Sequence, residues 1–290
     1  MPIKYFSTAW NDITSSPSWF PKLLLLGLVY CIPVFGQIVV LGYAFGWARE
    51  IAWGAHTPMP QHIFANEDGK LYRRGFFTLV IMFVFMLVPG ILEAIGAAMQ
   101  GATAYADSLY GAGFGVLPVI GGIFNVASAV AAFLISMPCW IGVMRMTLYD
   151  RLSAGFQLPK IWSMLKRDAG GMWRILGMSI LMMLVVEVIF TLIIGLFVVI
   201  AIASAVGIAG PAYFSGSLGA NMGADFGILA GGLLALGGVF IVLFIAVCYF
   251  GMVASVFVLL MVARAVGHWT SQFDVPHWRG QDDPMPFELA

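Results

Sequence analysis

Long runs of apolar residues, separated by short polar stretches, dominate the chain. A helix needs about 20 mostly apolar residues to cross the hydrocarbon core of a bilayer. Four runs reach this length, at residues 76–99, 116–137, 175–207 and 226–248. The pattern therefore predicts an all-α, polytopic transmembrane helix bundle, organised as a single integral membrane domain with four full spans.

A further apolar run lies within residues 22–53 and is interrupted by Ile32-Pro33-Val34-Phe35-Gly36. Proline removes a backbone donor and clashes with the preceding turn, so we expect the helix to break there. Lys22 and Arg49 flank a run that is too short for two full spans. We expect a re-entrant hairpin whose tip is formed by Pro33 and Gly36 and is buried against protein. The alternative is a single kinked span, which would give five spans in total.

Two of the apolar runs continue well past one bilayer thickness. One extends to Leu152 through Pro138, and the other extends to Val266 through Gly251. In each we expect a spanning helix, a break at the proline or glycine, and a second helix that extends to the cytoplasmic side. Residues 267–290 are predicted to form a cytoplasmic tail.

Two shorter segments are amphipathic. Residues 1–21 are predicted to contain an interfacial helix that lies flat on the membrane with its aromatic side down. Residues 159–167 form the second segment, which we expect to pack beneath the bundle, with docking of a cytosolic partner as the alternative. In the first segment Ile3, Phe6, Trp10 and Ile13 oppose Asn11, Asp12 and Thr14, and in the second Ile161, Met164 and Leu165 oppose Lys160, Lys166 and Arg167.

Composition and charge agree with a membrane protein. Hydrophobic residues make up 61% of the chain and charged residues only 10%, against roughly 25% charged in soluble domains. The net charge is zero, which argues against nucleic acid as a partner. The connections at residues 100–115 and 208–225 contain no Lys or Arg. Because Lys and Arg are retained in the cytoplasm, we expect a multi-pass protein of the cell (inner or plasma) membrane with a cytoplasmic C-terminus.

Glu187 is the main candidate for an intramembrane polar site, since it lies near the middle of an apolar run. An acidic side chain there costs roughly 2.5–3.5 kcal/mol on insertion scales, so it should face protein or water. It would serve either as a proton, cation or substrate site, or as a neutral acid hydrogen-bonded to Asn125 or Ser128. Glu93 is a weaker candidate, because it lies toward the outer end of its span.

Small residues are spaced for close helix packing. We expect Gly42 with Gly46, and Gly227 with Gly231, to bring helices of this chain together, with dimer formation as the alternative. Motifs for catalysis, cofactors or metals are absent: the chain has no Gly-Lys-Ser/Thr phosphate loop, no Gly-x-Ser-x-Gly elbow and no His-x-x-x-His pair. The three cysteines lack metal-ligand spacing. We therefore expect a protein that is not an enzyme and has no cofactor.

Several N-terminal segments resemble a known family. They are Ser16-Pro-Ser-Trp19, Pro21-Lys22 followed by four leucines, Ile32-Pro33-Val-Phe-Gly36, Leu41-Gly42-Tyr43, and Gly54 with Pro58-Met-Pro60. These segments are similar to the domain of unknown function 4013 family, which comprises polytopic membrane proteins of bacteria and archaea. The resemblance is specific over residues 10–77 and departs from the family in residues 61–67, where the family has an acidic, tryptophan-rich stretch. It implies the membrane class and no defined activity.

The leading functional interpretation is a non-enzymatic integral membrane protein that is permease-like or serves as a membrane subunit of a transport system. Broken helices and buried charges are common at transport sites, which favours this interpretation. The alternative is a structural or scaffold protein that binds a partner complex or organises the bilayer. The expected partners are the lipid bilayer and either further copies of the chain or a membrane complex.

Overall fold

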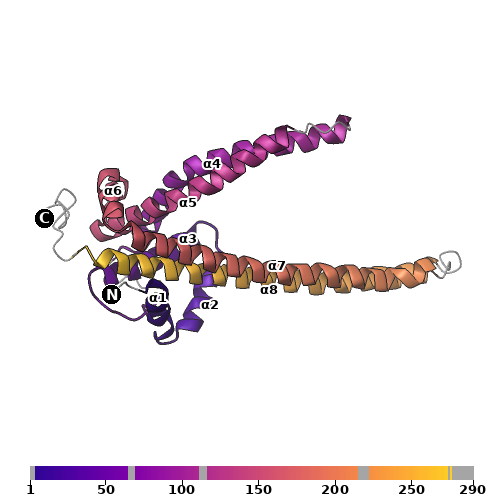
Figure 1. The fold of residues 1–290 in the computed structure, drawn as a ribbon. Coiled ribbons are helices and arrows are strands. Elements are labelled where there is room, and N and C mark those ends of the chain that lie inside the picture. Colours follow the sequence, from indigo (N-terminus) through magenta and orange to yellow (C-terminus); the bar gives the residue numbers. More distant parts are fainter. Residues whose placement is uncertain (1–3, 65–68, 111–115, 215–221, 274, 276–290) are drawn as a thin grey trace.

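The computed structural model describes residues 4–64, 69–110, 116–214, 222–273 and 275, and it leaves undescribed the side chains of residues 106–110 and of most of residues 201–240. Within this part of the chain all regular structure is helical (Figure 1). In chain order the helices are α1 (Tyr5–Thr14), α2 (Trp19–Tyr30), α3 (Phe35–Ala52), α4 (Leu71–Tyr110), α5 (Leu117–Tyr149), the 3-10 helix η1 (Leu152–Phe156), α6 (Leu158–Arg167), α7 (Ala169–Phe214) and α8 (Met222–Ser271).

Two long helical hairpins extend from one end of the molecule and diverge (Figure 1). We call the α4–α5 hairpin the first arm and the α7–α8 hairpin the second arm. The base is the end from which they extend; it contains α1, α2, α3, η1, α6 and the adjoining ends of the arms. Helix α3 packs against both α4 and α8, so it joins the two arms at the base.

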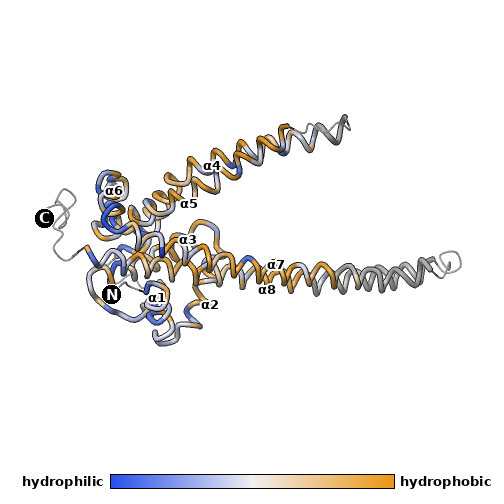
Figure 2. The backbone as a smooth tube through the Cα atoms, viewed as in Figure 1, coloured by the Kyte–Doolittle hydropathy of each residue, from blue (hydrophilic) through white to orange (hydrophobic). Residues whose placement is uncertain are grey.

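Four helices are long and apolar enough to cross a membrane, which confirms the predicted all-α fold with four candidate spans. They are Leu71–Tyr105, Leu117–Tyr149, Ala169–Ile200 and Ile241–Ser271, and Trp19–Tyr30 is a shorter apolar helix. Figure 2 shows the apolar residues running along both arms and the hydrophilic residues gathered at the base. The long helices extend at the base end beyond the predicted spans.

The N-terminal apolar run is broken where proline predicted it. Helix α2 ends at Tyr30 and α3 begins at Phe35, and Val34 between them has a φ of +63°. A Cβ at Gly36 would collide with the carbonyl oxygen of Val29, so the return turn leaves no room for a side chain there. At the other end Lys22 Nζ donates to the carbonyl of Met59, 3.0 Å away. The start of α2 and the loop after α3 therefore lie side by side, which is the geometry of a hairpin. The predicted burial of the tip against protein is wrong, because residues 31–35 are exposed and only Gly36, which lies against the carbonyl of Val29, is buried.

The predicted breaks at Pro138 and Gly251 are wrong, because α5 and α8 run through both positions. Proline in a helix removes one hydrogen bond, and membrane helices tolerate this loss when neighbouring groups compensate for it. Gly251 serves helix packing, since a Cβ there would lie 3.1 Å from the ring of Phe190 on α7. The predicted tail also begins too early, because residues 267–271 continue α8 and Trp269 is fully buried.

The two amphipathic segments are helices, and within this chain the predicted apolar side of α1 is only partly buried; its Ile3 lies outside the described residues. Ala9 and Ile13 are fully buried, whereas Phe6 and Trp10 are exposed. Asp12, which was expected to face solvent, is turned toward α8. Helix α6 packs as expected, with Ile161 and Met164 buried against the base.

Candidate functional site

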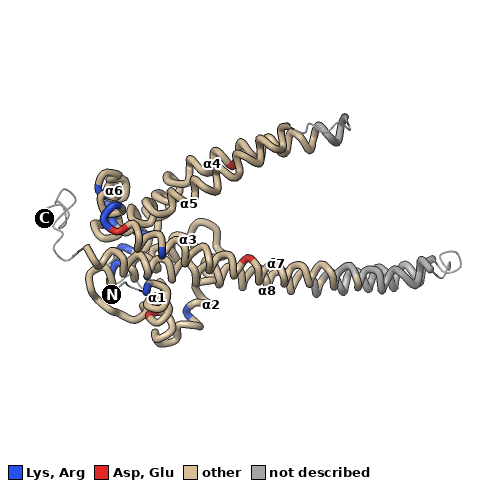
Figure 3. Tube along the Cα trace, viewed as in Figure 1, with Lys and Arg blue, Asp and Glu red and all other residues tan. Residues whose placement is uncertain are grey.

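Most charged residues of the described chain gather at the base (Figure 3). Three of the arginines there are buried. Arg74 on α4, Arg145 on α5 and Arg264 on α8 are each 5% exposed or less. Removing a cation from water costs several kcal/mol unless it is paired and hydrogen-bonded. Each of these arginines therefore needs a defined set of acceptors, and each set joins separate helices.

Asp150 is the acceptor that joins α3, α4 and α5. It lies just past the end of α5 with a φ of +53°. Its carboxylate accepts from Arg74 Nε at 2.8 Å and Lys70 Nζ at 2.8 Å, and Arg49 Nη2 lies 3.8 Å away. Burial raises the pKa of Asp150, but the hydrogen bonds from Arg74 and Lys70 outweigh it and hold the pKa below its ordinary value.

Asp12 plays the same role between α1 and α8. Arg264 Nε lies 2.7 Å and His268 Nε2 2.8 Å from the same carboxylate oxygen. Arg264 also donates to the carbonyl of Trp47 at 3.0 Å, and its guanidinium stacks 4.2 Å from the centre of that indole ring. Burial raises the pKa of Asp12, but hydrogen bonds from His268 and Arg264 outweigh it, so the pKa is lowered.

Arg145 contacts polar and aromatic groups at the junction between α5 and α6. Its Nη2 donates to the side-chain oxygen of Gln157 at 2.6 Å, and its guanidinium lies 5.4 Å from the centre of the Tyr149 ring. Met164 of α6 lies 3.8 Å from Nη1. The buried cation thereby fixes α6 beneath the first arm.

Residues 57–62 form a loop across the base that we call the strap. Its Pro58 and Pro60 cannot donate backbone hydrogen bonds, and Met59 N–H donates to the hydroxyl of Ser16 at 2.9 Å. Side chains of α2, α3 and α8 donate hydrogen bonds to carbonyl groups of the strap, so helices from both ends of the chain set its path. The donors are Trp47 and Arg264 to Thr57, Lys22 to Met59, and Tyr43 to Pro60, at 2.9–3.2 Å.

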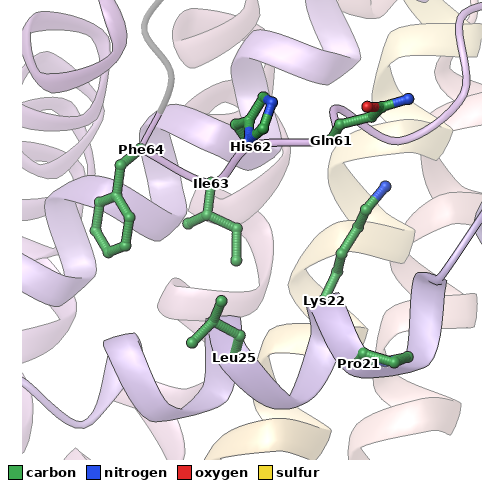
Figure 4. A pocket seen from close by; sticks show the side chains of 7 residues that line it. All are labelled: Pro21, Lys22, Leu25, Gln61, His62, Ile63 and Phe64. Carbon is green, nitrogen blue, oxygen red and sulfur yellow. The ribbon is translucent and has the colours of Figure 1, made fainter.

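Two hollows lie on either side of the strap. The first, which we call the strap cleft, has a volume of about 530 Å³ and lies between the strap, α3 and the start of α4; its charged lining residues are Arg49, Glu50 and Arg74. The second, the outer hollow, has a volume of about 500 Å³ and lies beside α2 (Figure 4). Gln61 and His62 line both hollows, so the two are neighbours.

The predicted intramembrane residues are not brought together. Glu93 is exposed on the first arm and Glu187 on the second. Asn125 lies against Gly96 within the first arm, and Ser128 donates to the carbonyl of Pro89. Neither of the proposed hydrogen-bond partners is therefore next to Glu187. In the described part of the chain, no group of three His, Cys, Asp or Glu residues is placed to hold a metal.

The glycines singled out from sequence lie in different surroundings. A Cβ at Gly42 would collide with the carbonyl oxygen of Leu71, so this glycine permits close contact between α3 and α4. Gly46 has only Arg74 nearby, with Nη1 3.9 Å from its Cβ position. Gly227 and Gly231 fall where side chains are not described.

The sequence analysis did not identify Asp12 and Asp150 as the carboxylates that pair with basic side chains at the base. For Asp12 a signal was present, because its partner Arg264 stands inside a long apolar stretch where a charge requires a partner. The spacing of residues along the chain does not reveal that the partner of Arg264 is 252 positions away.

A family described as "Protein of unknown function (DUF4013)" matches residues 25–195 of the chain. No curated protein and no solved structure matched it. The matched region includes the second half of α2, all of α3, the strap and the first arm, and it extends into α7. It covers more than half of the sequence and the hairpin with the Pro33 break. The chain therefore belongs to the DUF4013 family.

Proposed function

We propose that the protein is a non-enzymatic membrane subunit whose second arm completes its packing with another membrane-spanning chain in a permease-like assembly. The observation that carries this proposal is the exposure of Glu187 on an apolar helix. In the segment Ala169–Ile200, none of the most apolar stretch is buried within the chain.

The position of Glu187 along α7 supports this proposal. It lies 13 residues beyond Arg174, or about 20 Å along a helix axis, within a bilayer core about 30 Å thick. Intramembrane carboxyl groups face protein or water rather than lipid, because exposure to lipid is costly. Because this chain does not cover Glu187, we expect its carboxyl group to contact a second chain, or water held between the two chains.

The distribution of charge supports a cytoplasmic base. The Lys and Arg residues of the described chain gather there (Figure 3), and positive residues are retained on the cytoplasmic side. In this orientation the arms cross the cell membrane and their tips face outward.

Cross-linking beside Glu187 tests the proposal. Photo-reactive residues would replace Met183, on the same side of α7 as Glu187, and Val185, on the opposite side; both are exposed. We expect a protein adduct of one defined mass from position 183 in intact membranes and none from position 185. Equal adducts at both positions, or lipid adducts alone, would refute a specific protein contact at Glu187.

A scaffold is the second candidate function, and the divergence of the arms favours it. Among the described residues, the two arms contact each other little and only at the base. They therefore do not enclose a pathway for a transported substrate between them. A Glu187→Gln variant separates the candidates, because neutralisation would abolish a transport or proton-linked phenotype and leave a scaffold's partner binding intact.

A further inference from the structure

The strap cleft is lined by charged residues and the outer hollow mainly by apolar ones. The strap cleft presents Arg49 and Arg74, and Lys22 lines the outer hollow. Glu50 is the one carboxylate among the residues that line them, and the hydroxyl of Thr57 donates to it. The lining therefore carries three cations against one anion.

The floor of the strap cleft leaves space beside these cations. Gly42 and Gly46 of α3 both line it and contribute no side chain. Arg74 Nη1 lies on the Gly46 side of the cleft, while Nε of the same guanidinium is held by Asp150. Asp150 thus fixes the orientation of the arginine from behind without lining the cleft.

The outer hollow is mainly apolar. Figure 4 shows Leu25, Ile63 and Phe64 grouped on one side, with the Lys22 side chain extending toward Gln61. Leu25 and Phe64 are 46% and 49% exposed, so this apolar surface is accessible to the hydrocarbon part of a ligand. The strap residues Gln61 and His62 lie between this apolar surface and the arginines.

We propose that the strap cleft and the outer hollow together bind an anionic amphiphile whose phosphate lies near Arg49 and Arg74 and whose acyl chain lies along Leu25, Ile63 and Phe64. Arginine presents a planar fork of donors that matches phosphate oxygens. The apolar wall provides a surface for a hydrocarbon chain. A phospholipid headgroup and free phosphate share this phosphate chemistry, and the test distinguishes them.

The test uses the purified full chain in a neutral detergent and measures its unfolding midpoint with three additives. These are phosphatidylglycerol, phosphatidylcholine and inorganic phosphate. A ligand that binds the folded state raises the midpoint by mass action. We expect a concentration-dependent, saturable rise with phosphatidylglycerol and at most a small rise with the other two. An equal rise with phosphatidylcholine would refute the charge assignment, and an equal rise with inorganic phosphate would refute the amphiphile.

Matched variants locate the site. Arg49→Gln should weaken the apparent affinity for phosphatidylglycerol about tenfold, since hydrogen bonds to charged groups are strong. Arg73→Gln is the control, because Arg73 is an exposed arginine on α4 that lines neither hollow. Phe64→Ser should weaken lipid binding without loss of a folded base, because Phe64 is half exposed. Equal affinities for Arg49→Gln and Arg73→Gln, or an unchanged affinity in Phe64→Ser, would overturn the proposal.

Discussion

Asp12 and Asp150 are the single residues on which the buried charges of the base depend. Each carboxylate lies 2.7–2.8 Å from nitrogen atoms of two basic side chains: Arg264 and His268 for Asp12, and Arg74 and Lys70 for Asp150. Removing one partner of a buried ion pair leaves the other charge buried and uncompensated, which is strongly destabilising. Replacing the whole pair by apolar residues of similar volume costs much less. The two carboxylates therefore stabilise the fold chiefly because they compensate the charges of the buried Arg264 and Arg74.

Replacing Asp12 by asparagine should destabilise the protein. Asparagine keeps one acceptor oxygen but removes the negative charge that faces Arg264, whose side chain is 1% exposed. We expect the free energy of unfolding to fall by roughly 1.5–3 kcal/mol, measured by denaturant titration in detergent. The exposed neighbour gives the control, since Asn11→Ala should change the stability by less than about 0.5 kcal/mol. Similar losses in both variants would contradict the role of Asp12.

The stabilisation by Asp12 should disappear in acid. Its pKa is lowered in the folded protein from an ordinary value of 3.8, so the unfolded chain binds more protons as the pH falls. The stability advantage of the wild type over Asp12→Asn is therefore complete above about pH 5 and declines through and below 3.8. Unfolding midpoints of both proteins across this range measure it. An advantage that persists unchanged to about pH 2 would rule out this linkage.

Sequence indicated which residues were charged but not which of them would meet. Lys and Arg were interpreted as markers of membrane side, and Asp12 as part of a polar helix face. The structure turns Asp12 inward because Ala9 and Ile13 face α8 and bring the carboxylate to Arg264. Contacts over such sequence separations depend on the arrangement of the helices, which hydrophobic periodicity alone does not specify.

At the level of helices, glycines set the close approaches. In the first arm, a Cβ at Gly96 would collide with the side-chain oxygen of Asn125 and lie 2.8 Å from the carbonyl oxygen of Gly121. At the base, a Cβ at Gly267 of α8 would lie 2.6 Å from the carbonyl oxygen of Ala48 on α3. Membrane helices associate through such small-residue contacts, because hydrocarbon provides no hydrophobic drive.

Gly96→Ala should loosen the first arm. The added methyl group meets backbone of α5, which cannot move aside as a flexible side chain would, and overpacking typically costs about 1–3 kcal/mol. Gly101→Ala is the matched control on the same helix, because nothing lies within 4 Å of its Cβ position. Cysteine cross-linking between α4 and α5 would report the loss in Gly96→Ala. Equal cross-linking in both variants would contradict the close approach.

Length and hydropathy predicted the helices better than their interruptions. The four candidate spans and the break at Pro33 follow from apolar run length and from proline chemistry. Pro138 carries the same local signal as Pro33, yet α5 is continuous there. Met137 and Cys139 on either side of it are buried at the base. Tertiary packing therefore decides which proline ends a helix.

For the molecule as a whole, the notable feature is a compact base that carries two diverging arms (Figure 1). Ion pairs between different helices lie at the base, where α3 also packs against both arms, whereas α7 leaves its most apolar stretch uncovered. The base therefore holds the helices of the single chain together, and the second arm provides the surface for the proposed association with another chain.

Replacing Glu187 by leucine should affect assembly and leave the base intact. Glu187 is exposed, so we expect its replacement to remove little packing within the described chain. We expect an unchanged unfolding midpoint and a weaker cross-link from position 183, by about tenfold if one charged hydrogen bond is lost. A lowered midpoint with unchanged cross-linking would assign Glu187 to the fold of the single chain.

The most direct test of the account is a measurement of the side of the membrane on which the base lies. Single cysteines would be placed at Ser7, Ala55, Ser108, Ser217 and Gln281 in a cysteine-free chain and treated with an impermeant reagent in intact cells. The account predicts labelling only at positions 108 and 217, with α2 and α3 forming a hairpin that begins and ends in the cytoplasm. Labelling at position 7 from outside would instead make the N-terminal run a fifth span and would contradict a base that lies wholly on one side.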